Sequence, residues 1–373
     1  MMYKIGEVFT LIRNGANIKQ GEDDTGYPIT RIETISNRVV DRNKMGYAGI
    51  HEIGRYSDYI LEDGDILMSH INSETHLGKV ALYEKIPGET IIHGMNLLCL
   101  RPNRSILNCR YAFYSLMSDG FLRQIPRIMK KSVNQASFTV TALKELQIHV
   151  PPMEQQLQIV SVMDRIQSLL LQRQKQAAVI DQLVKSRFIE LFGDYDLTHP
   201  QESWVTIKEI GTVVGGATPK TDHDEYWGGS YRWITPAELE ADSGYIYDSV
   251  RKLTKAGVES CSLQEMPVGT VILSSRAPIG KVAIAGNTFY CNQGFKNIIC
   301  KEGITPRYLY TVLLLNVEYL NSLGRGATFK EISKGIVESI RIPVPSMELQ
   351  QQFAAFVEQT DKSKLCGKME VAA

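Results

Sequence analysis

Two runs of basic residues are the first feature of this sequence that could do chemistry. Between positions 120 and 144, and again between 275 and 301, basic residues occur without any acidic one. The runs contain Arg123, Arg127, Lys130, Lys131 and Lys144, and then Arg276, Lys281, Lys296 and Lys301. Such side chains can neutralise nucleic-acid phosphates. Either run alone could equally be a solvated surface, and a formal net charge of zero is unusual for a nucleic-acid binder. One run in each half of the chain is what favours binding.

Motifs of catalytic sites are missing. The sequence contains no Gly-x-x-x-x-Gly-Lys-[Ser/Thr] phosphate loop, no Gly-x-Gly-x-x-Gly, no Asn-Pro-Pro-aromatic and no Gly-x-Ser-x-Gly. Acidic pairs such as Asp63 and Asp65 stand in turn-like sequence, where a solvated turn is more common than an acid–base site. The six cysteines form no Cys-x-x-Cys pair and the seven histidines lack metal-ligand spacing, so we expect free thiols and no metal. We therefore expect a protein that is not an enzyme.

Length and hydropathy indicate an ordinary globular protein with two domains. The chain has 373 residues, of which 43% are hydrophobic and 22% charged. Its apolar stretches are too short to span a bilayer. Glu7 stands where a signal peptide needs an apolar run. We expect a cytoplasmic protein.

The chain repeats itself once. Short matches recur in the same order, offset by roughly 190 to 205 positions, which chance would not produce. They pair 5–8 with 207–210, 64–69 with 269–274, 78–81 with 280–283, 110–111 with 307–308, 136–138 with 327–329, and 150–154 with 344–348. The last pair reads Val-Pro-Pro-Met-Glu and Val-Pro-Ser-Met-Glu. The sequence predicts a tandem duplication.

Each half consists of a globular part and a helical tail. Short alternating strands and turns are predicted over 1–150 and 194–343, and prolines at 151, 152 and 345 mark the start of the tails, 151–193 and 344–373. Residues 154–191 contain no Gly or Pro. Positions 159, 166, 173, 180 and 187 and positions 163, 170, 177, 184 and 191 are largely apolar, a seven-residue repeat typical of a coiled coil. The second tail is the expected partner helix.

This arrangement resembles the specificity subunit of type I restriction-modification enzymes. The resemblance covers essentially the whole chain. It rests on the two proline-marked helices that follow two globular parts, on 273–283 (Leu-Ser-Ser-Arg-Ala-Pro-Ile-Gly-Lys-Val-Ala) and on 186–193 (Ser-Arg-Phe-Ile-Glu-Leu-Phe-Gly). It implies a mixed α/β (α+β) fold with two target-recognition domains, each reading half of a bipartite DNA site. Two long antiparallel helices would separate them.

The resemblance also implies partners. The helices would dock methyltransferase (modification) subunits, and restriction/translocase subunits would join through these. S-adenosylmethionine, ATP and Mg²⁺ would be bound by those partners and not by this chain.

Candidate DNA contacts follow from side-chain chemistry under this resemblance. Loops that differ between the halves, roughly 34–60 against 236–265 and 123–135 against 317–326, are free to read different bases. Side chains able to make paired hydrogen bonds to bases are Asn72, Asn134, Gln135, Asn292, Gln293, Arg276 and Arg325. Candidate phosphate contacts are Lys79, Lys130, Lys131, Lys281, Lys296 and Lys330.

The helix pair is predicted in more detail. Seam residues Ile166, Leu170, Ile180 and Val184 should be buried against Phe353, Phe356 and Val357 in an antiparallel pair. We expect the second helix to break at Cys366-Gly367, and so to be shorter than the family pattern, as in a truncated or recombined chain. Residues 183–192 should then be partly exposed.

Other functions remain open at this point. The chain could be a truncated or silent specificity cassette that donates recognition domains by recombination. It could also be a catalytic nuclease with an unrecognised site, or a protein-only adaptor with the same architecture.

Overall fold

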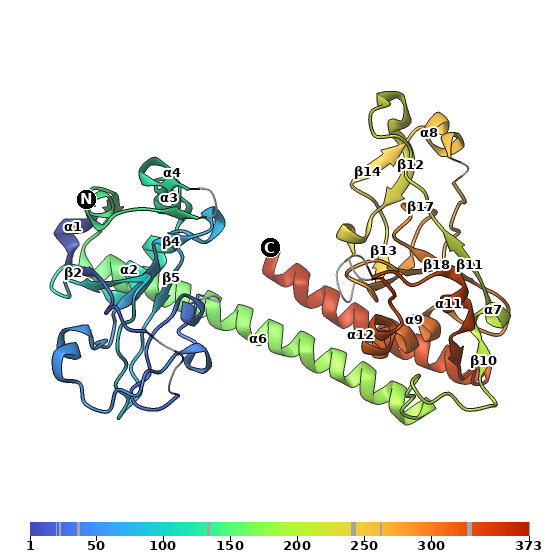
Figure 1. The fold of residues 1–373 in the computed structure, drawn as a ribbon, viewed down its shortest axis with the longest axis horizontal. Helices are drawn as coiled ribbons and strands as arrows, with labels where there is room; N and C mark the ends of the chain where they lie inside the picture. The colour runs from blue at the N-terminus through green and yellow to red at the C-terminus, as the bar shows by residue number, and fades with distance from the viewer. Residues whose placement is uncertain are drawn as a thin grey trace. The chain divides into compact units, whose positions relative to one another are not determined.

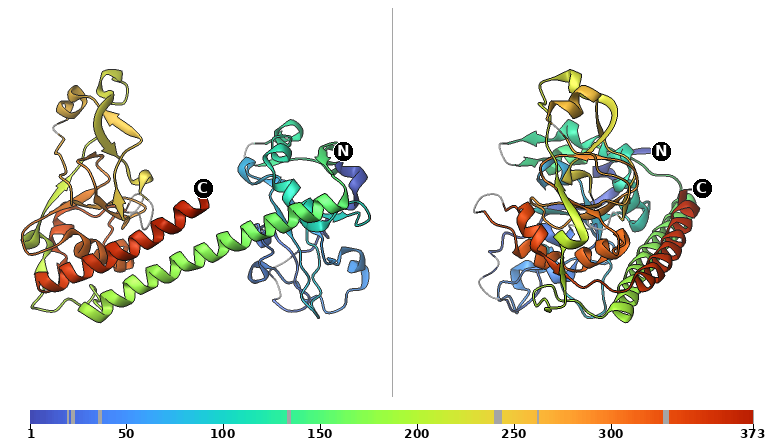
Figure 2. Two further views of the ribbon diagram at one scale, coloured as in Figure 1. Left: turned by 180° about the vertical axis from the view of Figure 1, so that it is seen from behind. Right: turned by 90° about the vertical axis from the view of Figure 1, so that its right-hand side faces the viewer.

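The structure is a computed structural model that describes residues 1–19, 21, 24–35, 38–132, 135–239, 244–261, 263–326 and 330–372, the last eleven as backbone alone. It divides into two compact units, Met1–Gln172 and Arg173–Ala373. Figures 1 and 2 show their elements.

A four-stranded antiparallel sheet forms the centre of the first unit. Its order is β2-β6-β3-β5, with bounds Phe9–Asn14, Leu97–Pro102, Ile66–Ser69 and Val80–Leu82. Strand β3 is buried at every position and β6 at all but one, because the sheet is covered on both faces. On one face lies α2 (Cys109–Met117), whose N-cap Asn108 accepts hydrogen bonds from the main chain of Arg110 and Tyr111.

The second unit repeats this sheet. Strands β11, β18, β15 and β16 follow in the same order, with bounds Gly211–Gly215, Lys296–Cys300, Val271–Leu273 and Val282–Ala285. A fifth strand, β13 (Tyr245–Ile246), pairs in parallel with β16. Helix α9 (Pro306–Leu315) takes the place of α2. The predicted mixed fold and duplication are therefore confirmed.

Each globular part is closed by a two-stranded pair. In the first unit β1 (Met2–Lys4) pairs with β9 (Gln147–His149), and in the second β10 (Val205–Thr206) pairs with β19 (Arg341–Ile342). The remaining strands form two three-stranded sheets. The sheet of the first unit has the order β4-β8-β7 (Ile71–Asn72, Ala136–Ser137, Lys130–Lys131), and that of the second has the order β14-β12-β17 (Arg251–Leu253, Trp227–Ile234, Tyr290–Cys291). The remaining short helices are α1 (Ile5–Val8), α3 (Asp119–Leu122), α4 (Ile125–Ile128), α5 (Val140–Lys144), α7 (Ile207–Ile210), α8 (Lys255–Ser260), α10 (Val317–Ser322) and α11 (Lys334–Ser339).

The two predicted long helices are α6 (Met153–Phe192) and α12 (Met347–Ala372). A buried glutamine fixes the start of each. The Gln156 carboxamide accepts from the Asn108 main-chain N–H at 2.8 Å and donates to the carbonyls of Ile106 and Pro151. Gln350 repeats this set with Thr305, Gly303 and Pro345. Each helix is thereby tied to the N-cap of the helix beneath it.

Within the second unit the C-terminal part of α6 runs antiparallel to α12 (Figures 1 and 2). Phe188, Phe353 and Val357 belong to one buried cluster, and the partly buried Val184 and Phe356 pack against it. Ile180 is half-buried.

Two expectations about these helices are wrong. Ile166 and Leu170 are 45% and 46% exposed, because α6 turns a different face, that of Gln156, Val160 and Asp164, toward the first unit. The expected partial exposure of residues 183–192 is found for eight of the ten, whereas Phe188 and Phe192 are buried in the core of the second unit. The expected break at Cys366-Gly367 is also absent from the backbone, which stays helical to Ala372. A single helical glycine costs only about 1 kcal/mol.

Candidate nucleic-acid interface

Strands β7 and β8 of the first basic run join β4 in a three-stranded antiparallel ribbon, β4-β8-β7, here called the first ribbon. Ile71 pairs with Ser137, and Lys130 and Lys131 pair with Ser137 and Ala136. Both lysines and the neighbouring Gln135 are exposed. Four of the predicted contact residues, Asn72, Lys130, Lys131 and Gln135, are thus brought to one ribbon. Asn134 lies outside the described residues.

The second unit has an equivalent second ribbon, built from the segments around Arg276, Glu331 and Arg325. Arg276 and Arg325 both form antiparallel bridges with Glu331. The main-chain N–H of Ile332 donates to Ser275 at 2.9 Å, as that of Phe138 donates to His70 at 3.1 Å in the first ribbon. Arg276, Arg325 and Lys330 are exposed. Corresponding places in the two units therefore present basic side chains to solvent.

A buried side chain lies at the root of each ribbon. His70 is 4% exposed, and its ring lies edge-on to Phe138 at 6.2 Å between centroids. Burial lowers the pKa of His70 to about 4, so the ring is neutral at neutral pH. Its Nδ1 has no hydrogen-bond partner among the described residues. The equivalent residue in the second unit, Ser275, is fully buried.

The cations of the two ribbons are paired differently. Lys131 lies 2.9 Å from Glu74, and both side chains are more than half exposed, so this pair is weak. In the second ribbon one carboxylate serves two cations: Glu331 Oε2 lies 2.9 Å from Arg276 Nε, and Oε1 lies 3.1 Å from Lys296 Nζ. Burial would raise the pKa of Glu331, but hydrogen bonds from Lys296 and Arg276 outweigh it and hold that pKa below its usual value. The carboxylate is ionised at neutral pH.

Other predicted contact residues are engaged elsewhere. The Lys281 ammonium donates to the main-chain carbonyls of Pro236 and Leu239, at 3.1 and 2.5 Å, and its expected phosphate contact stays a prediction. Asn292 caps a turn by accepting from the N–H of Gly294, and Gln293 accepts from the Thr218 hydroxyl. Lys79 is half-buried beside β5. These four residues are outside the pairings that define the ribbons.

Sequence reasoning missed Glu331 and His70. Glu331 is the single acid between positions 319 and 337, next to Lys330. This isolation in a basic segment was a usable signal. Nothing in the sequence marks His70, because its burial depends on the sheet beneath it.

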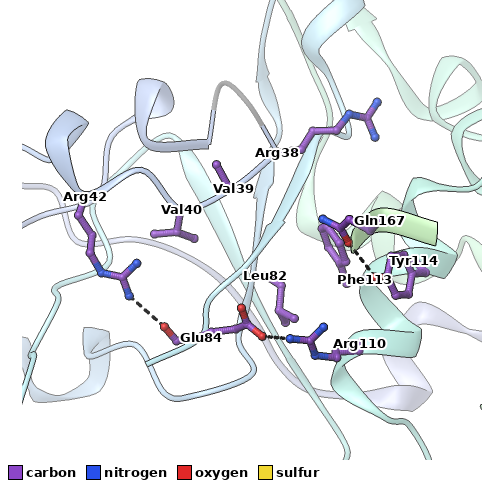
Figure 3. A pocket seen from close by; sticks show the side chains of 10 residues that line it. All are labelled: Arg38, Val39, Val40, Arg42, Leu82, Glu84, Arg110, Phe113, Tyr114 and Gln167. Carbon is purple, nitrogen blue, oxygen red and sulfur yellow. Dashed lines mark hydrogen bonds and ion pairs between the residues drawn. The ribbon is translucent and has the colours of Figure 1, made fainter. Parts of the chain in front are cut away.

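Figure 3 shows a pocket of the first unit between the segment 38–42, β5, α2 and α6. Two of its three arginines, Arg42 and Arg110, are paired with carboxylates, whereas Arg38 is drawn without a partner among the residues shown. Arg42 makes two hydrogen bonds to Glu89 and one to the carbonyl of Glu84, while Arg110 contacts the carboxylates of Glu84 and Asp164. The ion pairs of Arg110 thereby connect α2 to Glu84 and to α6 at this pocket.

Over the described ranges, no three His, Cys, Asp or Glu side chains are grouped so that they could bind a metal ion. In the same part of the chain, none of the helices has the length and apolar character needed to span a membrane.

Comparison with known proteins places the two units in one family. The model of the type I restriction modification DNA specificity domain matches residues 1–180 and 202–367. A putative type I restriction enzyme MjaX specificity subunit of Methanocaldococcus jannaschii is 33% identical over 375 residues, which cover 96% of this chain and 86% of that protein. The MjaIX specificity subunit of the same organism is 43% identical over 185 residues, 48% of this chain and 43% of that protein.

A solved structure shows the same fold. The chain aligns with the crystal structure of a type I restriction-modification system S subunit from M. genitalium with a TM-score of 0.57 and 15% identity. The alignment covers 100% of this chain and 92% of that one.

Proposed function

The chain belongs to the type I restriction-modification DNA specificity family, and on this premise we propose that it reads a bipartite DNA site, one half-site by each unit. The observation that carries the proposal is the pair of equivalent ribbons with exposed basic residues. Lys130 and Lys131 supply the charge in the first, and Arg325 and Lys330 in the second. Duplicated surfaces that have diverged can contact successive, different stretches of one duplex.

Its chemistry is recognition and not catalysis. Phosphate contacts would position each ribbon, and Asn72, Gln135 and Arg276 would contact base edges. S-adenosylmethionine, ATP and Mg²⁺ would be bound by partner subunits. Because its DNA target and those partners are intracellular, we expect the complex to act in the cytoplasm.

Methyltransferase subunits are the proposed direct partners, with restriction subunits joining through them. An apolar stripe on α6 within the first unit supports such docking. Its members share one side of the helix at about 100° per residue, are all at least 36% exposed, and are Ile159, Val162, Met163, Ile166, Leu169 and Leu170. Contiguous apolar surface of this kind marks protein–protein contacts.

The test is a domain exchange. The chain is co-expressed with its methyltransferase in a host, and the methylated sequence is determined by methylome sequencing. Exchanging 194–343 for the same region of a relative should change one half of that sequence and leave the other half unchanged. A simultaneous change in both halves would contradict separate reading by the two units.

The same experiment separates the other functions. No methylation in spite of a stable complex would indicate a silent cassette. Cleavage by the purified chain alone would indicate a nuclease, and lack of DNA affinity with the methyltransferase present would indicate a protein-only adaptor.

A further inference from the structure

The second ribbon contains a charged trio that the first ribbon lacks. Glu331 bridges Arg276 and Lys296, with both contacts at 3.1 Å or less. At the corresponding pairing in the first ribbon, Ile71 lies opposite Ser137. Isoleucine and serine carry no charge and cannot form an ion pair. Any role of the charged trio is therefore confined to the second unit.

Glu331 binds one particular edge of the Arg276 guanidinium. The carboxylate accepts a hydrogen bond from Arg276 Nε. Among the described residues, the Arg276 side chain makes no other hydrogen bond. The Nη1–Nη2 end has no recorded partner, and the side chain is 46% exposed. Two parallel N–H donors at the end of a fixed, planar group match the O6 and N7 acceptors of guanine in the major groove.

Lys296 keeps the trio cationic. Its side chain is only 14% exposed, and its ammonium contacts Ser275 Oγ at 3.4 Å as well as Glu331. It therefore offsets the charge of Glu331 from the buried side. The trio keeps a net charge of one positive unit, and that charge resides on Arg276 at the surface.

Resting on the proposed function, we infer that Glu331 is a specificity-determining positioning residue: it holds Arg276 so that the Nη1–Nη2 end reads a guanine in the half-site of the second unit. By binding the two cations, Glu331 also limits their attraction to phosphates of any sequence. The second half-site should therefore contain a guanine whose recognition depends on Glu331, and the first half-site should not.

The experiment uses the chain in complex with its methyltransferase. The half-sites are first identified by selection from random duplex DNA. Each guanine of the second half-site is then replaced by 7-deazaguanine, which lacks the N7 acceptor. At one position this should weaken binding by wild type about tenfold, as for half of a bidentate contact. Arg276→Met, which removes the guanidinium donors, should bind both duplexes equally.

Glu331→Gln should abolish the effect of 7-deazaguanine at the same position. Binding to unrelated DNA should tighten, and its salt dependence should steepen by about one unit in the log–log slope, because a released cation gains a phosphate contact. Glu331→Asp, which keeps the carboxylate, should restore part of the discrimination. Glu74→Gln, which removes the exposed partner of Lys131, is the matched control and should leave the second half-site unchanged. Thermal unfolding checks that each variant is folded.

The inference would be overturned if folded Glu331→Gln still distinguished guanine from 7-deazaguanine as wild type does. It would also be overturned if the loss of base specificity fell in the first half-site. Neither result would contradict the proposed reading of one half-site by each unit. If Glu331→Gln does not fold, Arg276→Met decides: a response to 7-deazaguanine that this variant retains at the same position would overturn the inference. Failure of the wild-type complex to select any sequence would instead overturn the proposed function.

Discussion

Phe188 of α6 lies 5.3 Å from Phe353 of α12, ring centroid to ring centroid, with the ring planes at 76°. This edge-to-face contact is part of the core of the second unit. The residue that matches Phe353 by the duplication, counted from Gln350 and Gln156, is Ile159. Ile159 is 41% exposed. The same helix face is thus covered in one unit and bare in the other.

The bare face gives the first prediction. Hydrogen exchange of residues 157–171 should slow when the methyltransferase subunit binds, because that stripe becomes buried. Residues 186–192, which include the buried Phe188 and Phe192, should exchange equally in both states. Ile159→Glu should weaken complex formation at least tenfold, whereas Val179→Glu, a control on the same helix at 65% exposure, should not. Equal protection of 157–171 with and without the partner would remove the docking role.

Replacing Lys130 and Lys131 by alanine should weaken binding to all DNA sequences and flatten its salt dependence. Each lost phosphate contact reduces the log–log slope by about 0.9. Lys85→Ala with Lys144→Ala is the control, since both lysines are exposed in the same unit but outside the ribbon. Fluorescence anisotropy over a salt series measures the slope. A slope equal to wild type would place the first ribbon away from the DNA.

Acid should destabilise the first unit before the second. Burial lowers the pKa values of His70 and His93 to about 4, against about 6.5 in an unfolded chain. Between these values the unfolded state binds more protons, so stability falls as the pH falls from about 6.5 to about 4. At pH 5 the loss is on the order of 2 kcal/mol per histidine.

The two units can be followed separately in this test. All three tryptophans, Trp204, Trp227 and Trp233, belong to the second unit. Urea unfolding at pH 7.5 and 5, read by tryptophan fluorescence and by far-ultraviolet circular dichroism, should show an early transition at pH 5 that fluorescence misses. His70→Asn combined with His93→Gln should reduce the separation. If the fluorescence and circular-dichroism transitions shift equally between pH 7.5 and 5, the two histidines are not the cause of the acid destabilisation.

A length change in α6 tests its role as a spacer. Four residues inserted after Ala177, which is exposed, should add about one helical turn, roughly 6 Å. The methylated site should gain about two unspecified base pairs, with both half-sequences retained. Ala177→Gln is the control of unchanged length. Altered half-sequences, or unchanged spacing in an active complex, would exclude the spacer role.

The glutamines at the starts of α6 and α12 should contribute equally to the free energy of unfolding of their units. Gln156→Ala leaves the N–H of Asn108 and the carbonyls of Ile106 and Pro151 without their buried partner, at a cost of about 2–4 kcal/mol. Gln350→Ala should do the same to the second unit. Their exposed neighbours, Gln155 and Gln351, serve as alanine controls. Urea unfolding measures each effect, and a loss below 1 kcal/mol would show that these bonds do not fix the helices.

Repetition and periodicity were enough to predict the architecture. The collinear matches gave the duplication, and an unbroken stretch without Gly or Pro gave α6 to within one residue at each end. Lys130 and Lys131 of the first ribbon and Arg276 of the second were identified within basic runs, because charge is visible in the sequence. Pairing was not. Lys281 and Lys296 are alike in sequence, yet one donates to buried carbonyls and the other to Glu331, since the partners come from segments about 35 or more residues away.

The face of α6 was wrongly assigned for a related reason. A heptad pattern gives the apolar positions of a helix but not which of them finds a neighbour. Ile166 and Val184 follow the same pattern, and only Val184 packs on a core.

The repeated hydrogen bonds of Gln156 and Gln350 also bear on how such a gene can evolve. Each globular half meets its helix through the same carboxamide connector, so the joint does not depend on which bases that half recognises. A crossover within the segments that encode the connectors would deliver a half that already fits its new neighbour. A lineage could then acquire a new combination of half-sites in one recombination event, without a series of intermediates that must each remain folded.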